Sequence, residues 1–130
     1  MRHINVAIFE PTPLACELLA HAIESSCNEI KVIATGVNSE FQDDSELKKA
    51  GVAVISLALQ DDPLGGLKLL RRLVREQPNV KCVLLVDEDN RDIGIEAFRS
   101  GAVGLCDRDK SCTHLCKCIR CVSEGQVWAN

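Results

Sequence analysis

The stretch VAVISLALQDDPLGG, residues 52–66, has the pattern of a buried strand that runs to the edge of a sheet. Its first five residues, VAVIS, are apolar up to Ser56, and the polar, proline- and glycine-containing residues that follow end the strand pattern. Four further stretches rich in branched residues have the same character, namely INVAIF (4–9), KVIATG (31–36), KCVLLV (81–86) and the shorter AVGLC (102–106). The chain therefore has five candidate strands.

Segments with apolar residues at helical spacing lie between these strands. The clearest sets are Leu14, Leu18 and Ala22, then Leu67, Leu70, Leu73 and Val74, then Ile93, Ala97 and Phe98. Pro13 suits the first turn of a helix, the pair Ser39–Glu40 suits a capped helix start, and Pro78 marks a helix end. The segment from Ser39 to Ala50 is the most polar of the expected helices.

Strand and helix thus alternate five times, which predicts an α/β domain with a doubly wound parallel sheet and helices on both faces. In open sheets of this kind, sites form where the carboxyl ends of the strands meet the following loops. These ends are Glu10, Ser56, Val86 and Asp107–Arg108, and we expect them to face one another.

The length and composition fit one compact domain. The chain has 130 residues, of which 46% are hydrophobic and only 3% aromatic, so Leu, Val, Ile, Ala and Cys must form the core. No apolar run approaches the roughly 20 residues that cross a bilayer, and the first residues are too briefly apolar for a signal peptide. A cytoplasmic protein without membrane contact is expected.

The net charge and the cysteines indicate which partners and which cellular compartment suit the chain. The net charge of −4 argues against tight binding of nucleic acid by this chain, because such affinity comes from clustered Lys and Arg. The eight cysteines are scattered through apolar segments, which favours free thiols in a reducing compartment.

Several stretches resemble the receiver domains of bacterial response regulators, which are CheY-like, and in particular those of the LuxR/NarL-type transcription factors. They are INVAIFEPTPLACELLAHAIE, GGLKLLRRLVREQPNVKCVLLV, AFRSGAVGLCDRD and IRCVSEGQVW. The resemblance implies that residues 1–130 form a flavodoxin-like (βα)5 domain with strand order 2-1-3-4-5. It also implies a C-terminal helix-turn-helix beyond the end of this chain.

The same resemblance implies a degenerate phosphoacceptor site. A working receiver uses an acidic pair to hold Mg²⁺, an aspartate to accept the phosphoryl group, a Thr or Ser, a Lys, and an aromatic residue coupled to the hydroxyl. The corresponding residues are Glu10 and Pro11, Ser56, Val86, Arg108 and Leu105. Too few oxygen ligands remain for Mg²⁺, and a serine hydroxyl is a poor nucleophile unless a base activates it. We expect no catalytic residue, no cofactor and no enzymatic activity.

Other interpretations of these residues stay open at this point. Glu10 and Arg108 could pair across the cleft, Arg108 could bind an anion, and Ser56 could be phosphorylated. The loop after Ser56 is about two residues longer than in the family, so Asp61 or Asp62 could reach back toward the site. The segment DEDNRD (87–92) is typical of a loop whose Asp and Asn side chains cap a helix.

The segment CDRDKSCTHLCKCIRC contains five cysteines in sixteen residues. If a helix spans Cys112 to Glu124, one apolar arc contains Cys112, Leu115, Cys116, Ile119 and Val122. His114, Cys118 and Cys121 fall on a more polar face, where they are weak candidates for a metal. They span about 10 Å, too far for one zinc ion, although two chains meeting there could complete a site or a disulfide. Redox sensing and dimerisation through this face are further possibilities.

The sequence thus predicts the regulatory receiver domain of a DNA-binding response regulator, independent of phosphorylation and acting through protein contacts. The expected partners are a second copy in a homodimer and a sensor kinase or other regulatory protein, with DNA bound only through a C-terminal domain absent from this chain. The alternatives are a receiver phosphorylated at Ser56 or at a displaced Asp, and a cysteine-based metal or redox sensor.

Overall fold

The centre of the molecule is a parallel β-sheet. The structure is a computed structural model that describes residues 3–42, 44–87 and 91–129. Within these residues the sheet has six strands in the order β2-β1-β3-β4-β5-β6. The strands are β1 (Ile4–Phe9), β2 (Ile30–Gly36), β3 (Val52–Ser56), β4 (Lys81–Val86), β5 (Gly104–Asp107) and β6 (Trp128–Ala129). The predicted α/β class and the order 2-1-3-4-5 are confirmed, with one additional strand at the edge.

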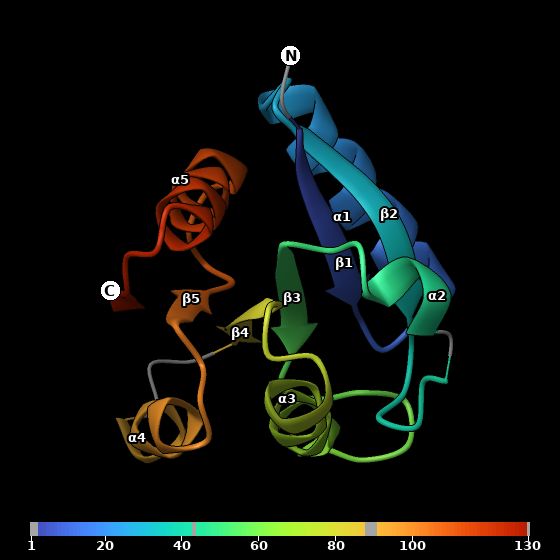
Figure 1. The fold of residues 1–130 in the computed structure, drawn as a ribbon, viewed down its shortest axis with the longest axis vertical. Coiled ribbons are helices and arrows are strands. Elements are labelled where there is room, and N and C mark those ends of the chain that lie inside the picture. The colour runs from blue at the N-terminus through green and yellow to red at the C-terminus, as the bar shows by residue number, and fades with distance from the viewer. Residues whose placement is uncertain (1–2, 43, 88–90, 130) are drawn as a thin grey trace.

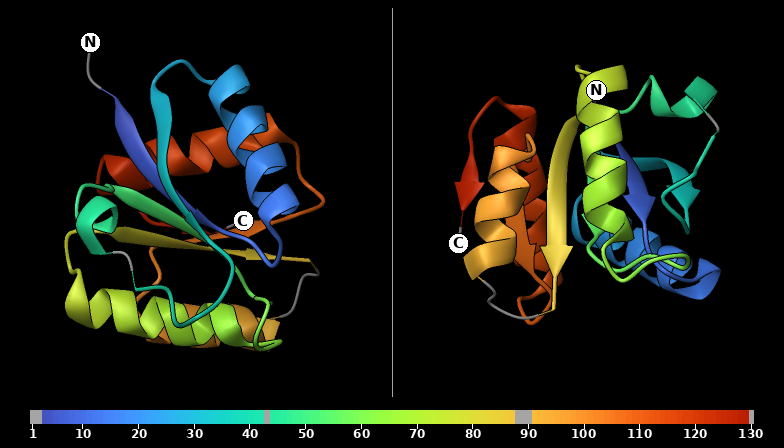
Figure 2. Two further views of the ribbon diagram at one scale, coloured as in Figure 1. Left: turned by 90° about the vertical axis from the view of Figure 1, so that its right-hand side faces the viewer. Right: turned by 90° about the horizontal axis from the view of Figure 1, so that it is seen from below.

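Helices cover both faces of the sheet (Figures 1 and 2). They are α1 (Pro13–Ser26), α2 (Asp44–Leu47), α3 (Gly65–Glu76), α4 (Arg91–Arg99) and α5 (Cys112–Ser123). Residues of α1 and α5 share one hydrophobic cluster with one face of the sheet, and residues of α2, α3 and α4 share another cluster with the opposite face. None of the helices in the described part of the chain is long and apolar enough to span a bilayer.

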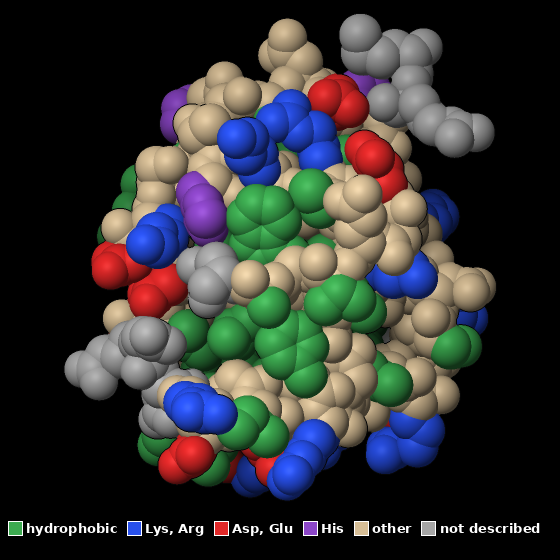
Figure 3. Space-filling view, turned by 90° about the vertical axis from the view of Figure 1, so that its left-hand side faces the viewer, with side chains coloured by type: hydrophobic (Ala, Val, Ile, Leu, Met, Phe, Trp, Pro, Cys, Tyr) green, Lys and Arg blue, Asp and Glu red, His purple; other side chains and the backbone are tan. Residues whose placement is uncertain are grey.

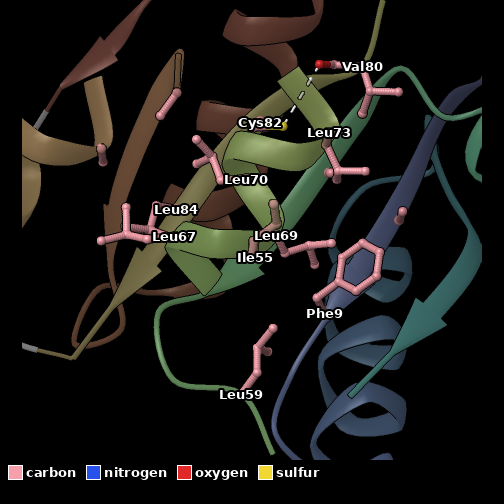
Figure 4. Packing of buried hydrophobic residues seen from close by; sticks show 14 of the residues in the cluster. Phe9, Ile55, Leu59, Leu67, Leu69, Leu70, Leu73, Val80, Cys82 and Leu84 are labelled. Atoms are coloured by element: carbon pink, nitrogen blue, oxygen red, sulfur yellow. Dashed lines mark hydrogen bonds between the residues drawn. The ribbon is translucent and has the colours of Figure 1, made fainter. Parts of the chain in front are cut away.

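Strand β3 is buried along its whole length, as its continuous apolar run predicts. Its side chains alternate between the two clusters, so that Val52 and Val54 lie toward α1 and α5, and Ala53 and Ile55 toward α3. Figure 4 shows how the second set packs, with Leu69 of α3 beside Ile55 and Phe9. Ser56, at the end of this strand, is therefore held by a rigid core.

Two helix starts carry side-chain caps, and one of them includes the predicted Pro13. The Thr12 hydroxyl accepts a hydrogen bond from the Ala15 amide at 3.0 Å, and Pro13 occupies the first helical position of α1. The Ser111 hydroxyl accepts one from the His114 amide at 3.2 Å at the start of α5. The approach of α5 to the sheet is thus fixed close to the site described below.

The predicted helix start at Ser39–Glu40 is wrong. Helix α2 begins only at Asp44 and has four residues. The Ser39 amide and hydroxyl both donate to the Asp61 carboxylate, at 3.1 and 2.6 Å, and Arg72 donates to the carbonyl oxygens of Ser39 and Phe41. These contacts with distant residues hold the segment as a loop, and a local helix would lose them.

The last two strands also differ from the prediction. Strand β5 begins at Gly104 rather than at Ala102, because the Ala102 amide bonds to Ala97 and closes the turn after α4. Strand β6 was not predicted. Gly125 has a φ of +92°, which reverses the chain after α5, and the Trp128 amide then donates to the Val103 carbonyl at 2.9 Å.

Gly66 offers a test of the packing behind Ser56. A Cβ atom at residue 66 would lie 2.0 Å from the Ser56 carbonyl oxygen, a backbone atom of the buried strand. We expect Gly66→Ala to lower the free energy of unfolding by about 3 kcal/mol, at the upper end of overpacking effects. Urea denaturation followed by circular dichroism measures it.

Gly51→Ala is the matched control, because its added Cβ would meet no atom closer than 3.8 Å. If both variants unfold at the same urea concentration, the close approach of α3 to the end of β3 is not as described.

Candidate functional site at the carboxyl edge of the sheet

Three strands deliver polar side chains to one edge of the sheet. Glu10 follows β1, Ser56 ends β3, and Arg108 follows β5. The Glu10 amide donates to Gly36 at 3.2 Å and the Arg108 amide to Val86 at 2.7 Å, so the ladder hydrogen bonds position both residues. The expectation that these strand ends face one another is confirmed.

The three side chains form one hydrogen-bonded network. The Arg108 guanidinium binds both oxygens of Glu10, with Nη1 at 3.1 Å from Oε2 and Nη2 in closer contact with Oε1. Nη2 also contacts the Ser56 hydroxyl, which donates to Glu10 Oε1. The predicted pairing of Glu10 with Arg108 is confirmed.

A fourth residue, Asp87, adds a second carboxylate beside the Arg108 guanidinium. Asp87 was not predicted as a site residue from the sequence. Its Oδ1 lies 2.8 Å from Arg108 Nε. Asp87 opens the acidic segment that we expected to cap a helix; residues 88–90 of that segment lie outside the described residues. Its position directly after β4 is the signal that could have identified it.

Burial explains why the network is tight. Glu10 is 3% exposed and Ser56 is 2% exposed, whereas the Arg108 side chain is 34% exposed. Burial alone would lower the pKa of Arg108, but the hydrogen bond and charge of Glu10, together with the charge of Asp87, raise it above its ordinary value. The guanidinium therefore stays charged and neutralises a carboxylate that water cannot reach.

A small cavity of about 140 Å³ adjoins the network. Its other walls are mostly apolar or backbone surface, from Pro11, Ala15, Leu57, Ala58 and Leu85. Ligand sites for small molecules usually measure about 300–1,000 Å³, so this cavity suits only a very small ligand.

The donor set fits a magnesium ion poorly. Mg²⁺ requires an octahedron of oxygens that includes one or two free carboxylates. Both Glu10 oxygens are bound to Arg108, Asp87 is bound to the same guanidinium, and Pro11 has no side-chain oxygen. The described residues contain no group of three or more His, Cys, Asp or Glu side chains that could hold a metal ion.

The two remaining positions of the predicted site lie in the core. Val86 is buried, and Leu105 is partly buried against the same cluster, between the sheet and the helices α3 and α4. The Leu105 Cδ2 atom comes within 3.1 Å of where a Cβ on Gly94 would lie, so it packs closely on α4. Neither side chain lines the cavity.

The two aspartates of the long loop point elsewhere. Asp61 accepts hydrogen bonds from Ser39, which lower the pKa of its carboxyl group. Asp62 forms an ion pair with Lys68 and accepts from the Leu64 amide at 2.7 Å, and this also lowers its pKa. Neither carboxylate lines the cavity beside Ser56.

The prediction that His114, Cys118 and Cys121 share one polar face of α5 is wrong. Cys118 is fully buried against the sheet, its sulfur is 3.3 Å from where a Cβ on Gly104 would lie, and burial raises its pKa to about 12. The His114 ring instead packs edge-on against Trp128, with ring centroids 5.2 Å apart. Helix α5 buries a wider arc than expected because it lies between the sheet and α1. All eight cysteines are free thiols, as predicted.

Comparisons with known proteins agree with this architecture. No family model matches the chain. A protein-glutamate methylesterase/protein-glutamine glutaminase of Rhodospirillum centenum is 30% identical over 113 residues, which are 85% of this chain and 28% of that protein. The chain therefore spans less than a third of the length of this curated relative.

Solved structures show the same fold at lower identity. A LuxR-family two-component response regulator from a species of Aurantimonas has a TM-score of 0.84 and 16% identity, over 98% of this chain and 89% of that one. The non-phosphorylated receiver domain of the stress response regulator RcsB from Escherichia coli has a TM-score of 0.83 and 18% identity, with 99% of each chain covered. The signal receiver domain of NarL from Mycobacterium tuberculosis has a TM-score of 0.82 and 19% identity, over 97% of this chain and 100% of that one.

A double-mutant cycle tests the network. Arg108→Gln leaves the buried Glu10 carboxylate without its cation, and we expect it to lower the free energy of unfolding by about 2–3 kcal/mol, less than for a fully buried pair because Arg108 is partly exposed. Adding Glu10→Gln should restore at least half of the loss, as measured by urea denaturation at pH 7.

Arg71→Gln with Glu96→Gln serves as the control pair, because Arg71 and Glu96 form an exposed ion pair at 2.8 Å. A coupling energy between residues 10 and 108 no larger than that of the control pair would contradict the network.

Proposed function

We propose that this chain, which has the receiver fold of the LuxR/NarL-type response regulators, is a regulatory receiver domain that works without phosphorylation. The observation that carries the proposal is the Arg108 guanidinium, which binds Glu10 and Ser56 at the edge of the sheet where a working receiver receives its phosphoryl group. The fixed positive charge takes the role that a metal ion has in a working receiver.

Phosphorylation of Ser56 would work against this arrangement. Ser56 is 2% exposed and its hydroxyl lies between Glu10 and Arg108, so a phosphoryl donor would have to displace this network to reach it. A phosphoryl group adds nearly two negative charges beside the carboxylates of Glu10 and Asp87. One guanidinium would then have to balance all of them. The serine is better explained as a hydrogen-bonding residue of the network.

The domain would instead act through protein contacts. Hydrophobic side chains gather on the face that carries α4, α5 and the C-terminal segment (Figure 3). Two hydrophobic residues of these segments are strongly exposed, Ile95 of α4 at 42% and Val127 before β6 at 67%. We propose this face, called the α4–α5 face, as the contact between two copies of the chain.

The wider role follows from the type of receiver. A domain of this kind would regulate a transcription factor whose helix-turn-helix lies beyond residue 130 and binds the DNA. A sensor kinase or another regulatory protein could bind the same domain without transferring phosphate. Each partner would shift the conformational equilibrium only by the difference between its affinities for the two states.

Treatment with acetyl phosphate and Mg²⁺ tests the central claim. The intact mass of the chain should not increase, and its amide NMR spectrum should not change, because Ser56 replaces the acceptor aspartate and the Glu10 carboxylate is already bound to Arg108. The positive control is the quadruple variant Pro11→Asp, Ser56→Asp, Val86→Thr, Arg108→Lys, which restores the residues of a working site. Addition of one phosphoryl group to the wild-type chain would disprove phosphorylation-independent function.

The α4–α5 face is tested separately. Ile95→Glu and Val127→Glu each place a charge in the proposed contact and should weaken self-association at least tenfold in sedimentation equilibrium. Leu18→Glu is the matched control, since Leu18 is 62% exposed on α1, on another side of the molecule. A dimer that is lost in Leu18→Glu but kept in Ile95→Glu would place the contact on α1 instead.

A further inference from the structure

A larger cavity lies beside the site described above, between the start of α1 and the end of β2. Its volume is about 390 Å³, and its walls come from the first turns of α1 and from residues between 35 and 41. Ligand cavities usually measure about 300–1,000 Å³, so this one can hold a small organic molecule. It lies at the carboxyl edge of the sheet, where open α/β sheets bind ligands.

The loop that forms one wall of this cavity is held in place by distant residues. Ser39 donates two hydrogen bonds to Asp61, and Arg72 donates to the Ser39 carbonyl oxygen at 3.0 Å. The Val37 carbonyl oxygen accepts a hydrogen bond from the Gln60 amide at 2.8 Å. These contacts keep the segment from forming a helix, and they give the cavity its shape before any ligand binds.

Phe41 supplies an aromatic wall. Its half-buried ring packs edge-on against Phe9, with ring centroids 5.2 Å apart. Gly36 makes room for this ring, because a Cβ atom at residue 36 would lie 2.8 Å from it. Pro13 and Val37 add further apolar surface. The cavity therefore suits a ligand with a small apolar or aromatic body.

Two carboxylates give the cavity its charge. Glu17 and Glu40 line it, and the described residues that line it include no Lys, Arg or His. Neither carboxylate forms an ion pair with another residue in the described part of the chain. Other glutamates do form such pairs, namely Glu10, Glu29, Glu46, Glu76 and Glu96. Two carboxylates without a cation therefore border one small space.

The Cys16 thiol also lines the cavity, and it is neutral. Burial raises its pKa, as do the charges of Glu10 and Glu17, and backbone hydrogen bonds lower it by less. The thiol donates to the Gly36 carbonyl oxygen at 3.4 Å. The charges on the walls are therefore those of Glu17 and Glu40.

We propose that this cavity binds a small organic ammonium ion with an apolar body, which acts as an effector of the domain. The ammonium group would lie beside the carboxylates of Glu17 and Glu40, with charge-assisted hydrogen bonds to them. The body would pack against Phe41, whose ring also attracts a cation. The two carboxylates would repel an anion, and a neutral molecule would leave their charges uncompensated.

A ligand in this cavity would contact the backbone that positions the site. Gly36 lines the cavity, and its carbonyl oxygen accepts the hydrogen bond from the Glu10 amide at 3.2 Å. Binding can thus change the position of the carboxylate that Arg108 neutralises. The proposal does not depend on whether Ser56 is phosphorylated, so it stands or fails independently of the function proposed above.

Titration of the full isotope-labelled chain with phenethylammonium, followed by amide NMR, tests the site. We expect the amide signals of Gly36 and Val37 to shift and to saturate. Phenethyl alcohol has nearly the same shape without the charge, and it should bind at least about tenfold more weakly. Hydrocinnamate, an anion of similar size, should bind less tightly than the alcohol.

The double variant Glu17→Gln, Glu40→Gln removes both carboxylates and should weaken the binding of phenethylammonium at least about tenfold. Both residues are exposed, so the variant should fold normally, as circular dichroism would verify. Glu124→Gln is the matched control, since Glu124 is an exposed glutamate at the end of α5, and it should bind like the wild type. Equal binding of the ammonium ion and the alcohol, unchanged binding in the double variant, or no saturable shift at Gly36 and Val37 would overturn the proposal.

Discussion

The buried carboxylate of Glu10 is the constraint on which the edge of the sheet depends. A carboxylate that is 3% exposed needs a cation and hydrogen-bond donors, because its desolvation otherwise costs several kcal/mol. Arg108 supplies the charge from the far side of β3, and Ser56 supplies a hydroxyl between the two. The ends of β1, β3 and β5 are thereby tied together by one hydrogen-bonded network.

The sheet could be predicted because its central strands are buried on both faces and are continuous apolar runs. Strand β6 could not be predicted, since two residues have no periodicity. Its pairing with β5 depends on the turn at Gly125, which brings the Trp128 amide to the Val103 carbonyl. The wrong helix start at Ser39 has a related cause. Ser39 has the chemistry of a cap, but its donors bind Asp61, twenty-two residues away. Contacts between distant residues overrode the local preference in both places.

The residues that lie together at the site could largely be predicted, but their hydrogen bonds and ion pairs could not. Parallel strands end at one edge, so Glu10, Ser56 and Arg108 had to lie near one another. The sequence does not show which oppositely charged side chain pairs with which. The contact of Asp87 with Arg108 was therefore not predicted, whereas Asp61 and Asp62 were considered for the site and instead bind Ser39 and Lys68. The prediction placed Cys118 on the polar face of α5, but the residue is buried. A helix that packs against both the sheet and α1 buries a wide arc of its surface, and the spacing of apolar residues does not show how wide that arc is.

The network also links the site to the proposed contact face. Asp87 opens the connection from β4 to α4, and Arg108 opens the connection from β5 to α5, so their ion pair joins the two loops that lead into the helices of that face. A partner that shifts α4 against α5 must change the distance between these loops. Stretching the ion pair between Asp87 and Arg108, which also neutralises Glu10, costs free energy. That free energy then contributes to the difference between the partner's affinities for the two conformations. If the domain works as proposed, the fixed guanidinium of Arg108 would in this way couple the binding surface to the edge of the sheet.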